Sequence, residues 1–431
     1  MKRYTKPELW GGVECSHWRL NDSYLNQLDI GGREKSSLQD LEKFAELGIR
    51  KLRYPVLMES FVSDSGTQWA ATKSALNKLH SLGISPIIEF LHHGCGPMDC
   101  TFLDKNFPAR IQRFASEVAL RFPWVKYYCP INEPLTTARF SGLYGIWYPH
   151  HRDQKTFARI FIAQVLGTVL SIKAIREINP EAKFIQIEDL CKIYSTPRLQ
   201  YQADFENERR WLTFDLLTSK VLPGHPMWAY LTWCGIKEKE LYLIAEEASA
   251  PDVLGLNHYV TSERFLDHRL DDYPEVLKGG NGTHEYVDLE AVRVPLDEPA
   301  GLEVLLKECW NRYSMPIALT EIHLCGANDD QIRWFHEAWK VALKLLAEGI
   351  PITGVCAWAL TGSYGWDKLL TQIPGKFEQG VFNIHNGQLV DSSYSLFIKD
   401  LVAKGESTHP SLNQKGWWHS EERFLKKLQC A

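Results

Sequence analysis

Two glutamates follow apolar segments that lie far apart in the chain. Glu133 comes after residues 127–132, and Glu321 comes after residues 317–320. Burying a charge is costly unless the charge is paired, so carboxylates at the ends of apolar segments point to a functional site. Two opposed carboxyl groups suit the cleavage of a glycosidic bond, in which one protonates the leaving oxygen and the other attacks carbon or activates water. The alternative is that both glutamates form ordinary ion pairs at the rim of the fold.

Other polar residues that end apolar segments suit the same chemistry. Arg53 would hold an attacking carboxylate in its ionised form, and Tyr259 would hydrogen-bond it. Asn132 would contact a sugar hydroxyl. The chain has 15 Trp, which either line a carbohydrate site or fill a large core. Further residues in such positions are His92, His93, Glu188, Asp189, Asn257, His258, His323 and Trp358.

Short apolar segments alternate with stretches of helical length along the whole chain. Strands are predicted at 9–15, 49–54, 86–91, 127–132, 183–188, 253–257, 317–320 and 352–358. Alternation of this kind implies a parallel sheet with helical crossovers, and eight units imply a closed (β/α)₈ TIM barrel with loop insertions. In such a barrel the carboxyl ends of the strands carry the active site, which would bring the residues above together.

The predicted helices are 37–47, 70–82, 107–122, 157–178, 206–219, 302–313, 330–348 and 393–403. Residues 260–300 are polar and rich in Gly and Asp, so we expect a long loop. With no break in composition, residues 1–431 are predicted to form a single domain with a C-terminal extension at about 405–431. A doubly wound open sheet is the alternative, but it needs a glycine-rich turn after the first strand, and Gly11-Gly12 lies inside that strand.

Composition excludes several classes of protein. The net charge of −5 argues against a nucleic-acid-binding protein, and 45% hydrophobic residues argue against disorder. The N-terminal residues are charged and no signal-like apolar stretch follows them, so the expected location is the cytoplasm. No apolar run of membrane-spanning length is expected, and the ten Cys are scattered, which favours reduced thiols.

No metal or cofactor is predicted, because the two carboxylates would act directly. The nearest approach to a metal-binding pattern is His92, His93, Cys95 and Cys100, which lacks the paired spacing of a zinc site. The expected partner is a carbohydrate or glycoside substrate, with neither nucleic acid nor membrane. The sequence leaves the oligomeric state open.

A series of short motifs runs in order from about residue 9 to residue 390. They are Trp10-Gly11, Leu52-Arg53-Tyr54, Leu91-His92-His93, Asn132-Glu133-Pro134, Arg210-Trp211, Asn257-His258-Tyr259, Thr320-Glu321 and Trp358-Ala359-Leu360 with Trp366. In order and spacing they resemble those of family 1 of the glycoside hydrolases, the retaining β-glycosidases of the β-glucosidase type. This resemblance implies a β-glycosidic bond cleaved by double displacement, with Glu133 as acid/base and Glu321 as nucleophile, about 5–5.5 Å apart. It also implies contacts to the glycone, the sugar that is cleaved off, from Arg53, His93, Asn132, Asn257, Tyr259, Trp358 and Trp366.

The sequence departs from this family at the floor of the glycone pocket. The usual Gln near the end of the opening strand is replaced by Trp18, beside His17, and the usual Glu between the two late Trp is replaced by Gly365. Gly94 and Ile322-His323 are further departures. Because specificity depends on satisfying buried polar groups, the altered pocket is expected to reject a plain glucoside. A deoxy sugar, a larger glycan or a nucleotide-linked sugar would fit, unless a neighbouring loop supplies the missing groups.

Two other functions remain open from the sequence. The altered pocket is consistent with a catalytically weak or inactive barrel that only binds sugars. A barrel acting in nucleotide-sugar metabolism is the third interpretation, although the chain has no glycine-rich phosphate loop.

Overall fold

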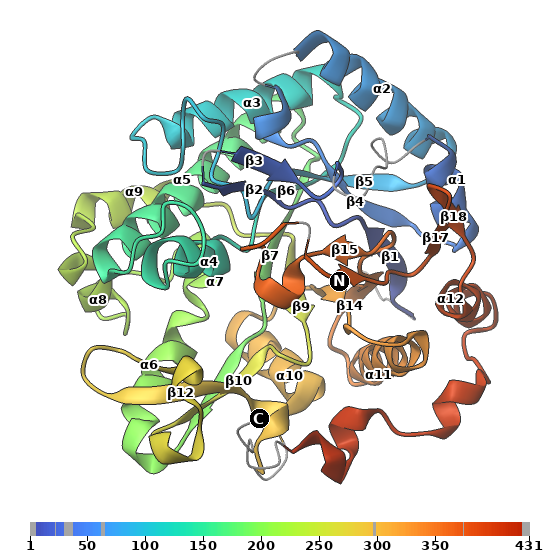
Figure 1. The fold of residues 1–431 in the computed structure, drawn as a ribbon. Coiled ribbons are helices and arrows are strands. Elements are labelled where there is room, and N and C mark those ends of the chain that lie inside the picture. The colour runs from blue at the N-terminus through green and yellow to red at the C-terminus, as the bar shows by residue number, and fades with distance from the viewer. Residues whose placement is uncertain are drawn as a thin grey trace.

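Eight parallel strands close into a barrel, which confirms the predicted (β/α)₈ fold. The computed structural model describes residues 6–21, 23–29, 38–61, 65–295, 299–373 and 375–424. Around the barrel the strands follow the order β1-β14-β13-β9-β7-β6-β5-β4, with the helices outside them (Figure 1). The barrel strands are β1 (Glu8–Gly12), β4 (Lys51–Pro55), β5 (Ser85–His92), β6 (Tyr127–Asn132), β7 (Lys183–Asp189), β9 (Val253–His258), β13 (Ile317–Ile322) and β14 (Ile352–Ala357).

The barrel interior is filled by side chains from several strands. Trp10 is almost completely buried there, in a cluster with Ile87, Ile185 and Trp358. The Trp10 indole fits because residue 354 on the neighbouring strand is Gly, and a Cβ there would lie 2.4 Å from the indole ring. The interior is therefore a packed core, and the chemistry is left to the strand ends.

The helices outside the barrel bury one face against the strands. They are α1 (Leu38–Glu46), α2 (Ser65–Ser81), α3 (Phe107–Arg121), α4 (Pro134–Ala138), α5 (Gln154–Ile178), α6 (Gln200–Arg209), α7 (Leu212–Leu217), α8 (Trp228–Trp233), α9 (Glu238–Glu247), α10 (Gly301–Tyr313), α11 (Asn328–Ala347) and α12 (Ser393–Lys404). The prediction of one helix over 206–219 was wrong, since α6 and α7 are separate there. The helix is interrupted at Arg210. The Arg210 guanidinium donates to the Cys191 carbonyl at 3.0 Å and to Glu308.

Residues 260–300 contain strands, so the prediction of a long loop was wrong. β10 (Glu263–Asp267), β11 (Lys278–Gly280) and β12 (Glu285–Glu290) join β8 (Lys192–Ser195) in a second sheet ordered β11-β12-β10-β8, on one side of the barrel (Figure 1). One face of this sheet buries Phe265, Val287 and Leu289. These strands are short and polar on their other face, so their composition alone looks like that of a loop.

Three short hairpins among the described residues lie outside the barrel sheet. They are β2 (His17–Leu20) with β3 (Ser23–Asn26), β15 (Ser363–Tyr364) with β16 (Phe377–Glu378), and β17 (Asn383–His385) with β18 (Gln388–Val390). The first hairpin was not predicted from the sequence. It follows directly on β1 and carries Trp18.

Helix α5 is long and apolar enough to cross a membrane by length and composition, contrary to the expectation from the sequence. In its most apolar window 72% of the residues are buried inside the protein. Gly167 lets α5 approach α3 closely, because a Cβ there would lie 2.9 Å from the Ile111 side chain. Because α5 is mostly buried, its apolar composition is that of a core helix.

The chain beyond α12 runs back past α11 towards α10 (Figure 1). Trp418 is buried, and its Nε1–H donates to Glu337 of α11 at 3.0 Å. The guanidinium of Arg293 lies 3.9 Å from the centre of the Trp417 ring. The predicted extension over 405–431 therefore packs on the barrel helices as far as residue 424, and residues 425–431 lie outside the described residues.

Candidate active site

The carboxyl ends of four barrel strands bring together most of the predicted site residues. Arg53 of β4 lies at the centre and is 1% exposed. Its Nη1 donates to Glu321 of β13 at 2.6 Å, and its Nη2 donates to Asn132 of β6 at 2.8 Å. One arginine thus fixes the positions of a carboxylate and an amide that are far apart in the sequence.

Glu321 is held by two donors, one on each carboxyl oxygen. Besides the bond from Arg53, the hydroxyl of Tyr259 donates to its second oxygen. Both Arg53 and Glu321 are buried, so the negative charge is paired by a cation and a hydrogen bond away from water. Burial and then the negative charges of Glu321, Glu133 and Glu14 raise the pKa of Tyr259, which keeps its hydroxyl a donor.

Glu133 lies in a different electrostatic environment. Asn257 Nδ2 donates to its Oε1 at 2.6 Å, and His93 Nε2 lies 3.8 Å from its Oε2. Burial, followed by the charges of Glu321 and Asp189, raises the pKa of Glu133 well above its ordinary value. Its surroundings therefore favour the protonated form of Glu133.

The backbone at Glu133 and His93 adopts the left-handed conformation, with φ of 44° and 56°. Such residues cost about 1–3 kcal/mol each and persist where the surrounding structure holds them. At Glu133 the chain turns from β6 into α4, which begins at Pro134, and the Glu133 N–H donates to the Ile187 carbonyl at 3.2 Å. The turn aims the carboxyl group into the site instead of along the helix.

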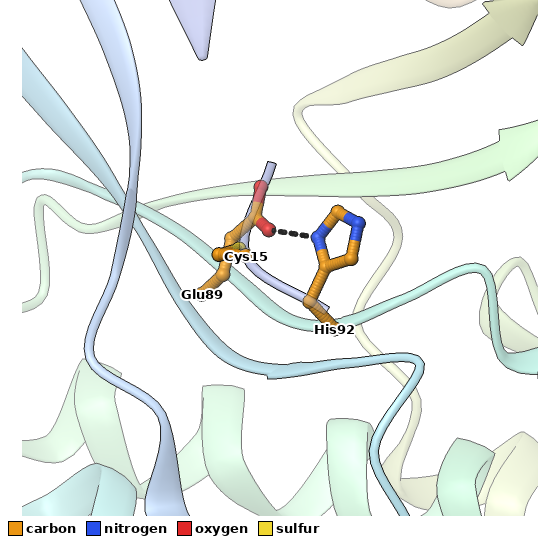
Figure 2. A group of neighbouring side chains, drawn as sticks. All are labelled: Cys15, Glu89 and His92. Atoms are coloured by element: carbon orange, nitrogen blue, oxygen red, sulfur yellow. Dashed lines mark hydrogen bonds and ion pairs between the residues drawn. The ribbon is translucent and has the colours of Figure 1, made fainter. Parts of the chain in front are cut away.

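A third buried glutamate, Glu89, also binds Arg53. It accepts from Arg53 Nε. Its other oxygen lies 2.8 Å from His92 Nδ1, a contact that Figure 2 shows. Burial alone would raise the pKa of Glu89, but the Arg53 charge and the His92 hydrogen bond lower it to about 2. Glu89 is therefore ionised and fixes the orientation of both neighbours.

Cys15, Glu89 and His92 are the one group of potential metal ligands found among the described residues, with ligand atoms within 4.8 Å of one another (Figure 2). Both Glu89 oxygens are already bound, one to Arg53 and one to His92. Burial and then the charge of Glu89 raise the pKa of Cys15, which opposes the thiolate form that a metal needs. The group fits a support for Arg53 better than a metal centre.

Two of the predicted tryptophans border the site, and the third lies further away. Trp358 stacks on His92 with ring centres 5.5 Å apart and planes 6° apart, and Trp366 contacts His93 with centres 5.4 Å apart. Trp18 is buried in an apolar cluster with Trp147 and Leu370, against which Trp366 packs. Trp18 thus packs behind Trp366 in this apolar cluster.

Three polar residues at strand ends have their closest partners outside the carboxylate pair. Glu188 accepts from the Leu135 N–H at 2.8 Å and from the Thr213 hydroxyl at 2.6 Å. His258 stacks on Trp334, and His323 Nε2 lies 3.0 Å from Glu378 Oε2. Successive residues on a strand face opposite sides, which explains why His258 leaves the site although Asn257 enters it.

Glu14 was missed as a site residue. It follows β1 and is 4% exposed, with Oε2 accepting from Trp366 Nε1 at 3.1 Å and Oε1 lying 3.9 Å from His92 Nε2. The predicted first strand ran to Cys15 and placed Glu14 inside it, whereas β1 ends at Gly12. With the correct strand end, Glu14 shows the same signal as Glu133, a carboxylate just after an apolar strand.

Comparisons with known proteins show what this chain is similar to. The sequence model of glycosyl hydrolase family 1 matches residues 39–375. The aryl-phospho-β-D-glucosidase BglC of Bacillus subtilis (strain 168) is 21% identical over 379 residues, which cover 76% of this chain and 77% of the relative. The aryl-phospho-β-D-glucosidase BglH of the same strain is 23% identical over 377 residues, which cover 78% and 76%.

Among solved structures, the β-glucosidase from Thermotoga maritima in complex with azafagomine has the same fold. The TM-score is 0.71 at 14% identity, over 94% of this chain and 99% of that chain. The family match spans well over half of the chain and includes both Glu133 and Glu321. The chain therefore belongs to glycosyl hydrolase family 1 and is a glycosidase that hydrolyses O-glycosyl bonds.

Proposed function

We propose that the enzyme cleaves a β-glycosidic bond by double displacement, with Glu321 as nucleophile and Glu133 as acid/base. The observation that carries this proposal is the contrast between the two carboxyl groups. Glu321 accepts from Arg53 and Tyr259, whereas burial and nearby negative charge raise the pKa of Glu133. Two carboxyl groups whose environments differ in this way divide into one anion and one acid.

In the first step, a Glu321 oxygen attacks the anomeric carbon and the bond from that carbon to the leaving oxygen breaks. The Glu133 proton passes to the leaving oxygen, and a glycosyl ester on Glu321 results. As the ester forms, the Arg53 charge is released from its pairing with Glu321. Arg53 stays positioned through its bonds to Glu89 and Asn132, so it is ready to receive the carboxylate again.

In the second step, Glu133 is now ionised and removes a proton from water. The water oxygen attacks the anomeric carbon, the ester bond to Glu321 breaks, and the sugar leaves with its original configuration. Asn257 keeps the Glu133 carboxyl group in place through both steps, since its Nδ2 donates to Oε1 at 2.6 Å.

We further propose that the glycone pocket differs from that of a plain glucoside enzyme. Trp18 and Gly365 stand where the family resemblance places polar hydroxyl ligands. Trp18 lies in an apolar cluster and Gly365 offers no side chain, so neither supplies a hydrogen-bond acceptor of its own.

The acid role predicts how Glu133→Gln depends on the leaving group. An amide gives up no proton, so kcat/KM on an alkyl β-glycoside is expected to fall at least 10²-fold, in the range of general acid catalysis. The first step on a 2,4-dinitrophenyl glycoside, whose leaving group needs no proton, is expected to change less than tenfold. Steady-state kinetics on both substrates measures the difference.

Glu263→Gln is the matched control, because it makes the same change at another buried glutamate, whose partners are Tyr194 and the Gly301 N–H and not Glu133. Its effect is expected to be the same on both substrates. An equal loss on both substrates in Glu133→Gln would remove Glu133 from the acid role.

A further inference from the structure

Glu14 is a buried carboxylate for which double displacement has no use. Its Oε1 accepts from the backbone N–H of Ser16 at 2.8 Å and from the Ser16 hydroxyl at 2.6 Å. Its Oε2 accepts only from Trp366 Nε1, at 3.1 Å, among the described residues. An ionised carboxylate offers about four lone-pair sites, so Oε2 retains an acceptor position beside the Trp366 ring.

A continuous chain of contacts connects this acceptor to both catalytic carboxyl groups. On one side, Trp366 donates to Glu14 and its ring contacts the ring of His93. The Nε2 of His93 lies 3.8 Å from Glu133. On the other side, Glu14 Oε1 lies 3.9 Å from His92 Nε2. The same His92 nitrogen lies 3.4 Å from Asn132 Nδ2.

Asn132 is in turn bound by Arg53, which holds Glu321. The contacts therefore connect one catalytic carboxyl group to the other, with Glu14 in the middle of the chain of contacts. Because the catalytic carboxyl groups act at the anomeric carbon, a sugar enclosed by these residues would turn its opposite edge towards Glu14.

The segment that carries Glu14 holds further unused polar groups. Trp18 Nε1 and His17 Nδ1 are buried and have no partner among the described residues. Buried polar groups without partners are rare in proteins, so these two atoms remain able to bind a ligand. The segment after β1 therefore holds polar groups, whereas Gly365 has no side chain to supply one.

We propose that Glu14 accepts a hydrogen bond from a glycone hydroxyl remote from the anomeric carbon, and so selects a neutral sugar over one that carries a phosphate there. This inference rests on the proposed glycosidase site for the position of the sugar. The two Bacillus subtilis relatives are named as aryl-phospho-β-D-glucosidases. A carboxylate at this end of the pocket would repel a phosphate group, so the proposal separates this enzyme from them by substrate.

The test compares Glu14→Gln with Glu8→Gln. Glu8 is a matched control, because its Oε2 also accepts from a Trp Nε1 at 3.1 Å, that of Trp10, while it stands at the amino end of β1. The probes are 4-nitrophenyl β-D-glucoside and β-D-galactoside, their 4-deoxy and 6-deoxy analogues, and their 6-phosphates. Binding of D-glucono-1,5-lactam and D-galactono-1,5-lactam, which are neutral, is measured by titration calorimetry.

In the wild-type enzyme, we expect the neutral glycosides to be cleaved faster than the 6-phosphates. Glu14→Gln is expected to lower kcat/KM on the preferred neutral glycoside about ten- to a hundredfold, as for a lost bond to a charged group. On the analogue that lacks the bound hydroxyl the change is expected to be less than twofold, and on the 6-phosphate kcat/KM is expected to rise. Glu8→Gln is expected to leave all rates within twofold. If Glu14→Gln does not fold, Glu14→Asp, which keeps the charge but shortens its reach, is expected to give the same pattern among the neutral substrates.

An equal loss on every substrate would show that Glu14 only positions Trp366, and a wild-type preference for the 6-phosphate would overturn the proposal as well. Failure of the glycosidase mechanism looks different. In that case no glycoside is cleaved, yet Glu14→Gln still weakens binding of a lactam at least tenfold. Absence of both turnover and lactam binding in the wild-type protein would overturn both proposals.

Discussion

At the scale of single residues, the site depends on the different surroundings of two glutamates, Glu321 and Glu133. Glu321 has a cation and a hydroxyl as partners, whereas Glu133 has an amide and negative neighbours. Sequence patterns predicted both glutamates because each follows an apolar strand. They did not predict Glu14, because its strand ends at Gly12, three residues earlier than the apolar pattern suggests.

Asp189→Asn tests the origin of the acidity of Glu133. The negative charge of Asp189 helps raise the pKa of Glu133, so its removal lowers that pKa. Activity needs protonated Glu133 and is lost as the pH rises through its pKa, so the basic limb of the kcat/KM profile is expected to move to lower pH. The measurement is kcat/KM across pH 5–10 on an alkyl glycoside.

Asp252→Asn is the control for this shift, since Asp252 precedes β9 at the amino end of the barrel and pairs with Arg176 and Lys183. Its basic limb is expected to coincide with that of the wild type. An unmoved limb in Asp189→Asn would mean that Asp189 does not influence the acid.

At the scale of elements, the strand ends carry the two glutamates, and the segments that connect strands and helices carry the residues around them. The eight barrel strands could be predicted because each is a short apolar run between helices. The sheet formed by β8, β10, β11 and β12 could not, since only one face of these short strands is apolar. Nor could the break between α6 and α7, which depends on long-range bonds of Arg210.

The segments after β4 and β5 meet at a buried carboxyl group that makes stability depend on pH. Glu59 lies in the short helix Met58–Phe61 and accepts from the Gly96 N–H at 3.2 Å, while its Oε2 has no partner among the described residues. Burial raises the pKa of Glu59 from 4.5 to about 8. Between these two values the folded state binds more protons than the unfolded state, so Glu59 lowers stability as the pH rises from about 4.5 to 8.

Glu59→Gln is therefore expected to stabilise the protein at pH 9 relative to the wild type. One pKa unit corresponds to about 1.36 kcal/mol, so the gain amounts to a few kcal/mol at pH 9 and to little near pH 4.5. Urea denaturation at pH 5 and pH 9 measures the difference. The same change in stability at both pH values would contradict this role of the carboxyl group.

At the scale of the whole molecule, the barrel is that of family 1, and we propose that the floor of the glycone pocket differs. The family match and the closed barrel agree with the motifs in the sequence. In the sequence, Trp18 and Gly365 stand in place of the family's usual Gln and Glu, which suggested that the glycone pocket had lost polar groups. The structure places Glu14 beside Trp366, which no local pattern could reveal, because the segments after β1 and β14 meet only when the barrel closes.

The central claim is that Glu321 becomes covalently linked to the sugar. The most direct test is mass spectrometry of the intact protein after incubation with activated 2-deoxy-2-fluoro β-glycosides, followed by peptide mapping. The fluorine slows both steps and the activated leaving group restores the first, so the ester accumulates. We predict one sugar adduct, on Glu321, in the wild type and none in Glu321→Gln. An adduct on another residue, or an unmodified Glu321 across a panel of glycones, would contradict the account and favour a barrel that binds sugars without cleaving them.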